Sequence, residues 1–89
     1  MRIVHIETHA RFDKRYRKLL KRIKESAKEK EKIFRIDPFH PSLNAHKLHG
    51  EEKDAWAFSI DQKYRIKFLF LNDNSVLFLD IGTHDNVYR

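Results

Sequence analysis

The chain of 89 residues contains no cysteine and has only two glycines and two prolines. Without cysteine, the sequence excludes a disulfide framework, a thiolate metal site and a cysteine nucleophile. Two glycines are too few for a nucleotide-binding loop. There is also no paired-carboxylate motif, which argues against glycosidase and two-metal chemistry. We therefore expect neither a cofactor nor a metal ion.

Long apolar runs are missing as well. No stretch of about 18 apolar residues is present, and the first residues alternate apolar and polar side chains instead of forming a signal segment. The hydrophobic content of 40%, with seven Phe and one Trp, is enough for one small core but not for two. The sequence thus predicts a single domain over residues 1–89 and a soluble protein of the cytoplasm.

Positive charge is concentrated in one part of the chain. The net charge is +6, and residues 11–35 hold twelve Lys and Arg against four Asp and Glu. Such a segment attracts polyanions, either nucleic acid or an acidic protein, although a solvated helix surface has the same composition. For an RNA partner, we expect the contacts to come from basic residues of the first helical region and of the segment before the main strands. These residues are Arg11, Lys14, Arg15, Lys18, Lys21, Arg22 and Lys47.

The first half of the chain has the pattern of one strand and two helices. Residues 2–6 are rich in β-branched side chains and predict a short strand. Thr8 is expected to cap a helix that ends near Lys24 and carries apolar residues at three-to-four spacing. Ser26, with Glu29 three residues later, resembles a capping box and predicts the start of a second helix.

Three runs in the second half alternate apolar and polar residues and predict antiparallel strands, at 55–60, 64–70 and 76–81. A slip of one residue would turn every side chain to the other face, so the register must keep the large apolar groups together. A three-residue loop at 61–63 and a two-residue loop at 73–74 satisfy this condition. The resulting pairs are Ile60 with Tyr64, Phe58 with Ile66, Trp56 with Phe68, Ile66 with Ile81, Phe68 with Leu79, and Phe70 with Leu77.

The helices must cover this apolar face, so the predicted fold class is α+β. A two-helix hairpin would pack on a small antiparallel sheet in the order β-α-α-β-β-β. The other face is then left open. It would carry Arg65 opposite Ser59, Lys67 opposite Asp80, and also Phe78. We expect a shallow basic concavity there.

The residues near this open face suit acid-base and phosphate chemistry. His84 follows the last strand, where Gly82 lets the chain turn, and His46 lies at the edge of the sheet. An imidazole is the natural acid or base at neutral pH. Arg65, on a rigid strand, offers fixed donors to a phosphodiester. The structural alternatives are a surface role for His84 and a hydrogen bond from Arg65 to Ser59.

Two other features favour structural interpretations. His46 and His49 have the spacing of some helical metal ligands, but beside a strand they would point to opposite sides, which argues against a metal site. We therefore interpret His49 as a surface residue. Asp80 can either pair with Lys67 or orient His84, and we favour the structural pairing.

Several motifs follow the helical region in a defined order. They are His-Lys-Leu-His-Gly at 46–50, Tyr-Arg-Ile-Lys-Phe at 64–68, and Gly-Thr-His at 82–84, with an aromatic residue at Tyr88. In this order they resemble the RelE/ParE superfamily of toxins from type II toxin–antitoxin systems, nearest to its YafQ-like members. The resemblance covers nearly the whole chain and implies the β-α-α-β-β-β fold. Many members cut messenger RNA in the ribosomal A site by driving a ribose 2′-hydroxyl onto the adjacent phosphate.

The resemblance also implies roles for individual residues. His46 and His84 match two histidines of the YafQ-like site, Arg65 matches the strand arginine of RelE-like toxins, and Tyr88 matches the terminal aromatic residue. Lys67 is the neighbouring cation of the same strand. The candidate catalytic residues are therefore His46, Arg65, Lys67, His84 and Tyr88.

Two positions depart from the family pattern. Ser59 stands where YafQ-like toxins have another histidine on the strand, and Lys63 stands where they have an acid at the start of the next strand. Cleavage would then rest on a different set of residues, or be weak or absent.

Three functions are compatible with these observations. The first is a ribosome-dependent mRNA endoribonuclease toxin that inhibits translation and acts without a metal ion. Its partners would be a cognate antitoxin, the ribosome and mRNA, and it would contact operator DNA only through the antitoxin complex. The second is a non-catalytic member that acts by binding, either as a DNA gyrase inhibitor or as an antitoxin- or nucleic-acid-binding module. The third is a nucleic-acid-binding domain unrelated to toxins. No membrane partner is expected.

Overall fold

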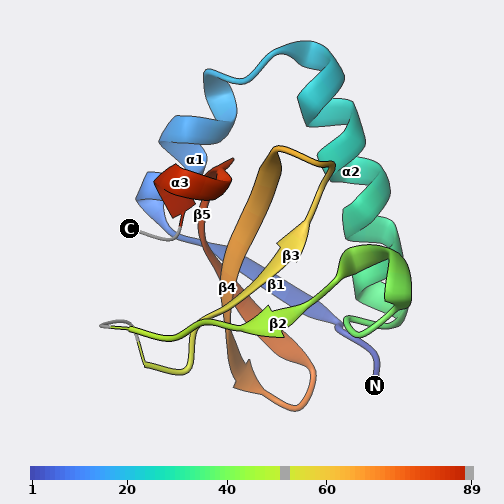
Figure 1. Ribbon diagram of the computed structural model, residues 1–89. Helices are drawn as coiled ribbons and strands as arrows, with labels where there is room; N and C mark the ends of the chain where they lie inside the picture. The colour runs from blue at the N-terminus through green and yellow to red at the C-terminus, as the bar shows by residue number, and fades with distance from the viewer. Residues whose placement is uncertain (51–52, 88–89) are drawn as a thin grey trace.

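The computed structural model of the chain, shown in Figure 1, describes residues 1–50 and 53–87. Two helices lie over one face of a sheet, so the predicted α+β class is confirmed. Within the described residues, no helix is both long and apolar enough to cross a membrane. The elements are β1 (His5–Thr8), α1 (Ala10–Arg17), α2 (Lys21–Ile36), the 3-10 turn η1 (Pro41–Leu43), β2 (His46–Lys47), β3 (Trp56–Ser59), β4 (Tyr64–Asn72), β5 (Ser75–Thr83) and α3 (His84–Val87).

The sheet is mixed and not purely antiparallel. Its strand order is β1-β5-β4-β3-β2, and β1 runs parallel to β5, with His5 opposite Ser75. A parallel pair requires a long connection between its strands, and both helices together with the other strands form that connection. The short strand β2 and the terminal helix α3 add to the predicted element order.

Helix α1 is shorter than the sequence pattern indicates. Its cap is His9, whose Nδ1 accepts a hydrogen bond from the backbone N–H of Arg11 at 3.0 Å, so the predicted cap at Thr8 is wrong by one residue. The helix ends at Arg17 and not near Lys24. The next two backbone N–H groups bond to carbonyls three positions back, which gives a tight 3-10 ending. The chain can then change direction before α2.

Helix α2 continues through the point where the sequence predicts a helix start. It follows Leu20, which provides no side-chain cap, and Ser26 lies in its second turn, so the predicted boundary is wrong. Ile23, Ala27 and Phe34 are buried and lie on one side of this helix. Their common stripe outweighs the local capping-box pattern, because burial of an apolar face stabilises a helix more than one cap does.

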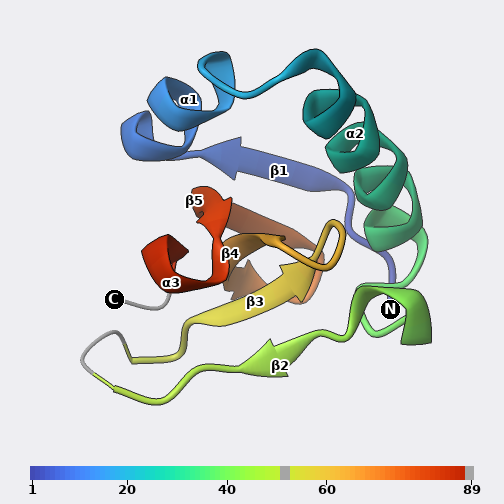
Figure 2. The same ribbon diagram turned by 45° about the horizontal axis from the view of Figure 1, so that its top comes forward.

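The two helices lie on the same side of the sheet, as Figure 2 shows. Between them is a groove with a volume of about 600 Å³. Ile6, Phe12, Ile66 and Phe78 are among its apolar lining residues, and charged residues of both helices also line it. The predicted helical layer is present, but α1 and α2 pack on the sheet separately, on either side of this groove.

The register between β3 and β4 is the predicted one. Phe58 pairs with Ile66 and Trp56 with Phe68, and the N–H of Ile60 bonds to the carbonyl of Tyr64 at 2.9 Å. The alternation of large apolar residues alone therefore predicts the register correctly in this part of the sheet.

The register between β4 and β5 is predicted correctly over one half only. Ile66 pairs with Ile81, as expected, but Phe68 pairs with Phe78 because the register shifts at a bulge between Lys67 and Phe68. The bulge adds one residue to β5 and changes which of its side chains face the helices. Phe78 is therefore in the core, 1% exposed, and its predicted place on the open face is wrong.

The core is organised around one aromatic side chain of α2. The Phe34 ring stacks on that of Phe58 at 4.7 Å between centroids and meets the edges of Phe68 and Phe78 at 5.0 and 5.7 Å. Phe34 is fully buried and touches three strands, so it connects the helical layer to the centre of the sheet.

Replacing Phe34 should strongly destabilise the protein. We expect Phe34→Ala to lower the free energy of unfolding by about 3–5 kcal/mol, because the cavity lies where three rings meet. Urea unfolding followed by circular dichroism measures this change. Ile36→Ala, at an exposed position of the same helix, should cost less than about 0.5 kcal/mol. Similar losses for the two variants would contradict the central role of Phe34.

Candidate functional site

The sheet register gathers polar residues into one row across four strands. Asp80 of β5 pairs with Lys67 of β4, Lys67 with Ala57 of β3, and Ala57 with His46 of β2. Neighbouring strands are about 4.8 Å apart, so the backbones of Lys67 and His46 are separated by roughly 10 Å. The row lies on the face opposite Phe34. It therefore brings a cation, a carboxylate and an imidazole to one side of the sheet.

Arg65 occupies the next row of that face, between Ser59 of β3 and Gly82 of β5, as predicted. Its Nη1 donates to the carbonyl oxygens of Asp61 at 2.6 Å and Tyr64 at 3.0 Å. The guanidinium is thus directed toward the turn between β3 and β4. These bonds hold it in one orientation, so Arg65 is part of this face but leans away from Lys67.

The predicted open concavity is largely closed. Lys67 is only 7% exposed and Asp80 only 4%. Helix α3 turns back against β4 and β5, with Val87 buried (Figure 1). Ala57 is also buried on this side, so the face has a small apolar layer of its own. Lys67 therefore lies in a covered site, whereas Arg65 in the next row is half-buried.

Arg15 of α1, predicted from the sequence only as an RNA-binding cation, also contacts this site. Its Nε lies 3.4 Å from Oδ1 of Asp80, and its side chain is 40% exposed. The same Asp80 oxygen accepts the backbone N–H of Ile81 at 2.8 Å. Asp80 thus forms an ion pair with Arg15, and it also lies opposite Lys67 in the sheet. Arg15 therefore has a structural role here, and its predicted role in RNA binding stays a prediction.

Gly82 makes room for this contact. A Cβ atom there would lie 3.3 Å from Nη1 of Arg15 and 3.4 Å from Cβ of Asn86, so both α1 and α3 approach the strand closely at this point. One sequence signal was available. Arg15 is three residues after the buried Phe12 and next to Tyr16, so it lies on the apolar side of α1.

His46 is exposed at the start of β2, and its hydrogen bond determines its tautomer. Nδ1 lies 2.9 Å from the carbonyl oxygen of Asn44, and a carbonyl can only accept, so Nδ1 carries the proton. In the neutral ring the lone pair is then on Nε2. This is the arrangement that a general base requires.

His84 begins α3 beyond the end of β5. Its backbone N–H bonds to the carbonyl of Lys63 at 3.0 Å, and its Nδ1 lies 3.6 Å from Oδ1 of Asp85. The side chain is 58% exposed. The remaining predicted catalytic residue, Tyr88, lies outside the described residues.

The other histidines divide into caps and surface residues. His9 caps α1, and His40 caps η1 by accepting the backbone N–H of Ser42 at 3.2 Å. His5 and His49 are exposed. Over residues 1–50 and 53–87, no group of three or more His, Cys, Asp or Glu side chains is placed to hold a metal ion.

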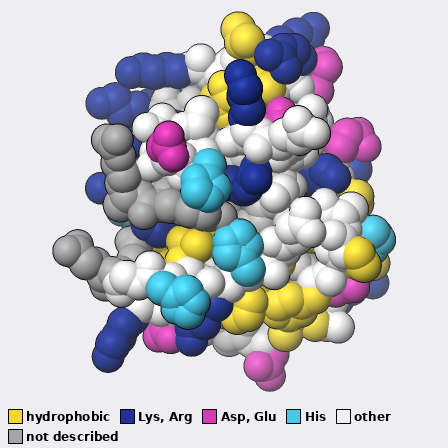
Figure 3. Space-filling model, in the orientation of Figure 1, with side chains coloured by type: hydrophobic (Ala, Val, Ile, Leu, Met, Phe, Trp, Pro, Cys, Tyr) yellow, Lys and Arg dark blue, Asp and Glu magenta, His cyan; other side chains and the backbone are white. Residues whose placement is uncertain are grey.

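The predicted RNA-binding cations lie mainly on α1 and at the start of α2. Figure 3 shows Lys and Arg side chains at the top of the molecule and His side chains grouped lower on the same face. Lys47, on β2, forms an ion pair with Asp54 at 3.5 Å. The exposed members of the predicted set are Arg11, Lys14, Lys18, Lys21, Arg22 and Lys47.

Comparison with solved structures shows that this is the fold of small RelE-type toxins, as the sequence motifs suggested. The chain is similar to YafQ from E. coli, with a TM-score of 0.78, 19% identity and complete coverage (100%) of both chains. It is also similar to a YoeB/ParE toxin from Agrobacterium tumefaciens, with a TM-score of 0.76, 13% identity, and coverage of 91% of this chain and 99% of that one.

A third structure with this fold is the archaeal RelE–RelB complex from Pyrococcus horikoshii, with a TM-score of 0.70 and 18% identity, covering 93% of this chain and 96% of that one. The sequence matches no protein-family model and no curated protein. At these identities, the likeness establishes the fold.

The buried carboxylate of Asp80 provides a test of this site. We expect Asp80→Asn to destabilise the protein by about 1–3 kcal/mol, because Arg15 and Lys67 lose a nearby negative charge while Arg15 keeps partial access to water. Urea unfolding measures the loss. Glu29→Gln, which breaks the exposed pair with Lys32, should cost less than about 0.5 kcal/mol. A null effect of Asp80→Asn would contradict a structural ion pair.

Proposed function

We propose that this chain is the toxin of a type II toxin–antitoxin system and that it cleaves messenger RNA on the ribosome. The observation that carries the proposal is the row Asp80–Lys67–Ala57–His46, with His84 at the end of the neighbouring strand. The row combines an imidazole with a suitable tautomer and a cation on one face, and His84 adds a second imidazole just beyond the end of β5. The shared fold with YafQ, YoeB and RelE toxins supports the same conclusion.

The reaction uses the RNA's own 2′-hydroxyl as nucleophile. His46 takes the 2′-hydroxyl proton on Nε2, the oxygen forms a bond to the adjacent phosphorus, and the bond from phosphorus to the 5′-oxygen breaks. His84, when protonated, gives its proton to the leaving 5′-oxygen. The products are a 2′,3′-cyclic phosphate and a 5′-hydroxyl end.

Lys67 stabilises the charge that develops on the phosphate. Its position beneath the face, next to Asp80 in register, holds the ammonium in a preorganised and partly dehydrated place, where electrostatic stabilisation is strongest. Arg65 binds the RNA strand beside the reacting phosphate, because its guanidinium is directed toward the β3–β4 turn. Tyr88 stays a predicted member of the site.

The ribosome and an antitoxin are the proposed partners. The exposed cations of α1 and the start of α2 would contact ribosomal RNA and orient the site over the message. Related structures are complexes with antitoxins, namely DinJ with YafQ and RelB with RelE. A cognate antitoxin would cover the basic surface of this chain, and operator DNA would be bound only through that complex.

A non-catalytic role is the second candidate. The covered position of Lys67 and the serine at position 59 favour it, because both weaken the resemblance to the YafQ-like site. The chain would then act by binding, to DNA gyrase or to an antitoxin or nucleic acid.

Expression without an antitoxin separates the two roles. We expect the wild-type chain to arrest growth and to cut messenger RNA, and His84→Ala to lower the cleavage rate about 10²- to 10⁴-fold, as loss of a general acid does. Arg65→Ala should also weaken cleavage by reducing RNA binding. Primer extension on a reporter message measures the cut sites and their extent.

The matched control is His5→Ala, which removes an exposed histidine from β1 at the far edge of the sheet. It should cleave like the wild type. Growth arrest that persists unchanged in both His84→Ala and Arg65→Ala, with no cut message, would favour the binding role.

A further inference from the structure

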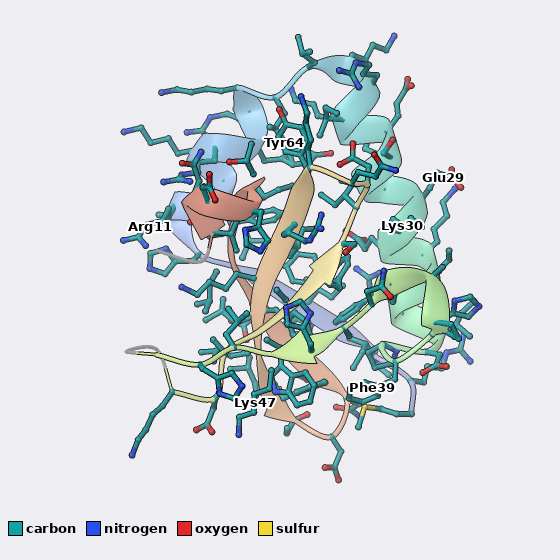
Figure 4. The ribbon with its side chains drawn as sticks, in the orientation of Figure 1. Arg11, Glu29, Lys30, Phe39, Lys47 and Tyr64 are labelled. Atoms are coloured by element: carbon teal, nitrogen blue, oxygen red, sulfur yellow. The ribbon has the colours of Figure 1, made fainter. Side chains whose placement is uncertain are left out.

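A second polar feature lies beside the row described above. It is a hollow with a volume of about 360 Å³, at the edge of β3 where α2 and η1 pass the β3–β4 turn. Figure 4 labels Lys30, which approaches it from α2. We call it the β3-edge hollow. Its lining includes Lys30, Ser42, Asn44, Ser59, Gln62 and Arg65.

The hollow is electropositive. Lys30 and Arg65 contribute two cations from different elements. Asp61 also lines the hollow, but its Oδ1 accepts the backbone N–H groups of Lys63 at 2.8 Å and Tyr64 at 2.7 Å. The carboxylate is thus engaged by the turn that it stabilises, and it opposes the two cations less than a mobile carboxylate would.

Both cations have hydrogen-bonding capacity left for a ligand. Arg65 donates through Nη1, and among the residues that the structure describes no hydrogen bond engages the N–H groups on Nε and Nη2. Lys30 Nζ has a long contact of 3.4 Å with the carbonyl of Ser42, which is easily replaced. The hydroxyl of Ser59 and the amide of Gln62 add neutral donors. Several converging donors around two cations suit an anion with several oxygen atoms.

We propose that the β3-edge hollow binds a backbone phosphate of the RNA strand, next to the phosphate that reacts, with Lys30 and Arg65 as its cations. This inference rests on the proposed function. The backbone positions of Arg65 and Lys67 are two residues apart on β4, or about 7 Å. This is comparable with the spacing of consecutive phosphates in an extended single strand. A strand whose reacting phosphate is at Lys67 therefore has its next phosphate within reach of Arg65 and Lys30.

The test combines protein variants that lack one positive charge with RNA probes that lack the charge of one phosphate. The probe is a short single-stranded RNA with 2′-O-methyl riboses, which cannot be cleaved, in which one phosphate at a time is replaced by a neutral methylphosphonate. Binding to the full chain is measured at low ionic strength by fluorescence anisotropy. For the wild type, we expect a methylphosphonate at one phosphate, next to the phosphate that would react, to lower the affinity about five- to tenfold. We call this loss the penalty.

Lys30→Ala should reduce that penalty, because one of the two cations that bind this phosphate is gone, and should reduce the salt slope of binding by about 0.7. Lys30→Arg should restore the penalty. Lys28→Ala, which removes an exposed lysine of the same helix that lines the groove between α1 and α2, should leave the penalty unchanged.

Three outcomes would overturn the inference. They are no position-specific penalty in the wild type, the same penalty in Lys30→Ala as in the wild type, or an equal loss of the penalty in Lys28→Ala. Cleavage of message by the wild type on ribosomes is scored separately. If the message is cleaved but Lys30→Ala leaves the penalty unchanged, only the assignment of the hollow is wrong. If Lys30→Ala lowers the penalty but no message is cleaved, only the nuclease assignment is wrong.

Discussion

Strand β4 has two chemically different sides, and the whole site depends on which side the helices cover. Ile66 and Phe68 pack toward Phe34, so alternation of the strand turns Arg65 and Lys67 to the opposite face. A slip by one residue would expose the aromatic side chains and bury the cations against them. At about 25 cal/mol for each Å² of apolar surface, that alternative is strongly disfavoured. The same burial that stabilises the fold therefore positions the chemistry.

This constraint explains which features could be predicted from the sequence. The pairing of β3 with β4 followed from the alternation of large apolar residues alone, and it placed Arg65 opposite Ser59 and Lys67 opposite Ala57. The α+β class followed from the same pattern. The alternation also indicated correctly that Lys67 would lie opposite Asp80.

Other features depend on contacts between distant parts of the chain, and local patterns do not reveal them. The bulge after Lys67 changes the side that Phe78 faces, because core packing there favours an extra residue in β5. The start of α2 was obscured because Ser26 fits a capping box, while the stripe through Phe34 requires one continuous helix. Helix α3, which packs against β4 and β5, has four residues with no helical signature of their own. The role of Arg15 appears only when α1 is docked beside β5.

The parallel pairing of β1 with β5 has a consequence for synthesis of the chain. His5 finds its partner, Ser75, only after both helices and three other strands have been made. Contacts between such distant segments close a long loop and form slowly. During translation, β1 leaves the ribosome early and must wait for the last strand. The row on β4 and β5 is completed in the same late event, so a nascent or truncated chain carries an unfinished site.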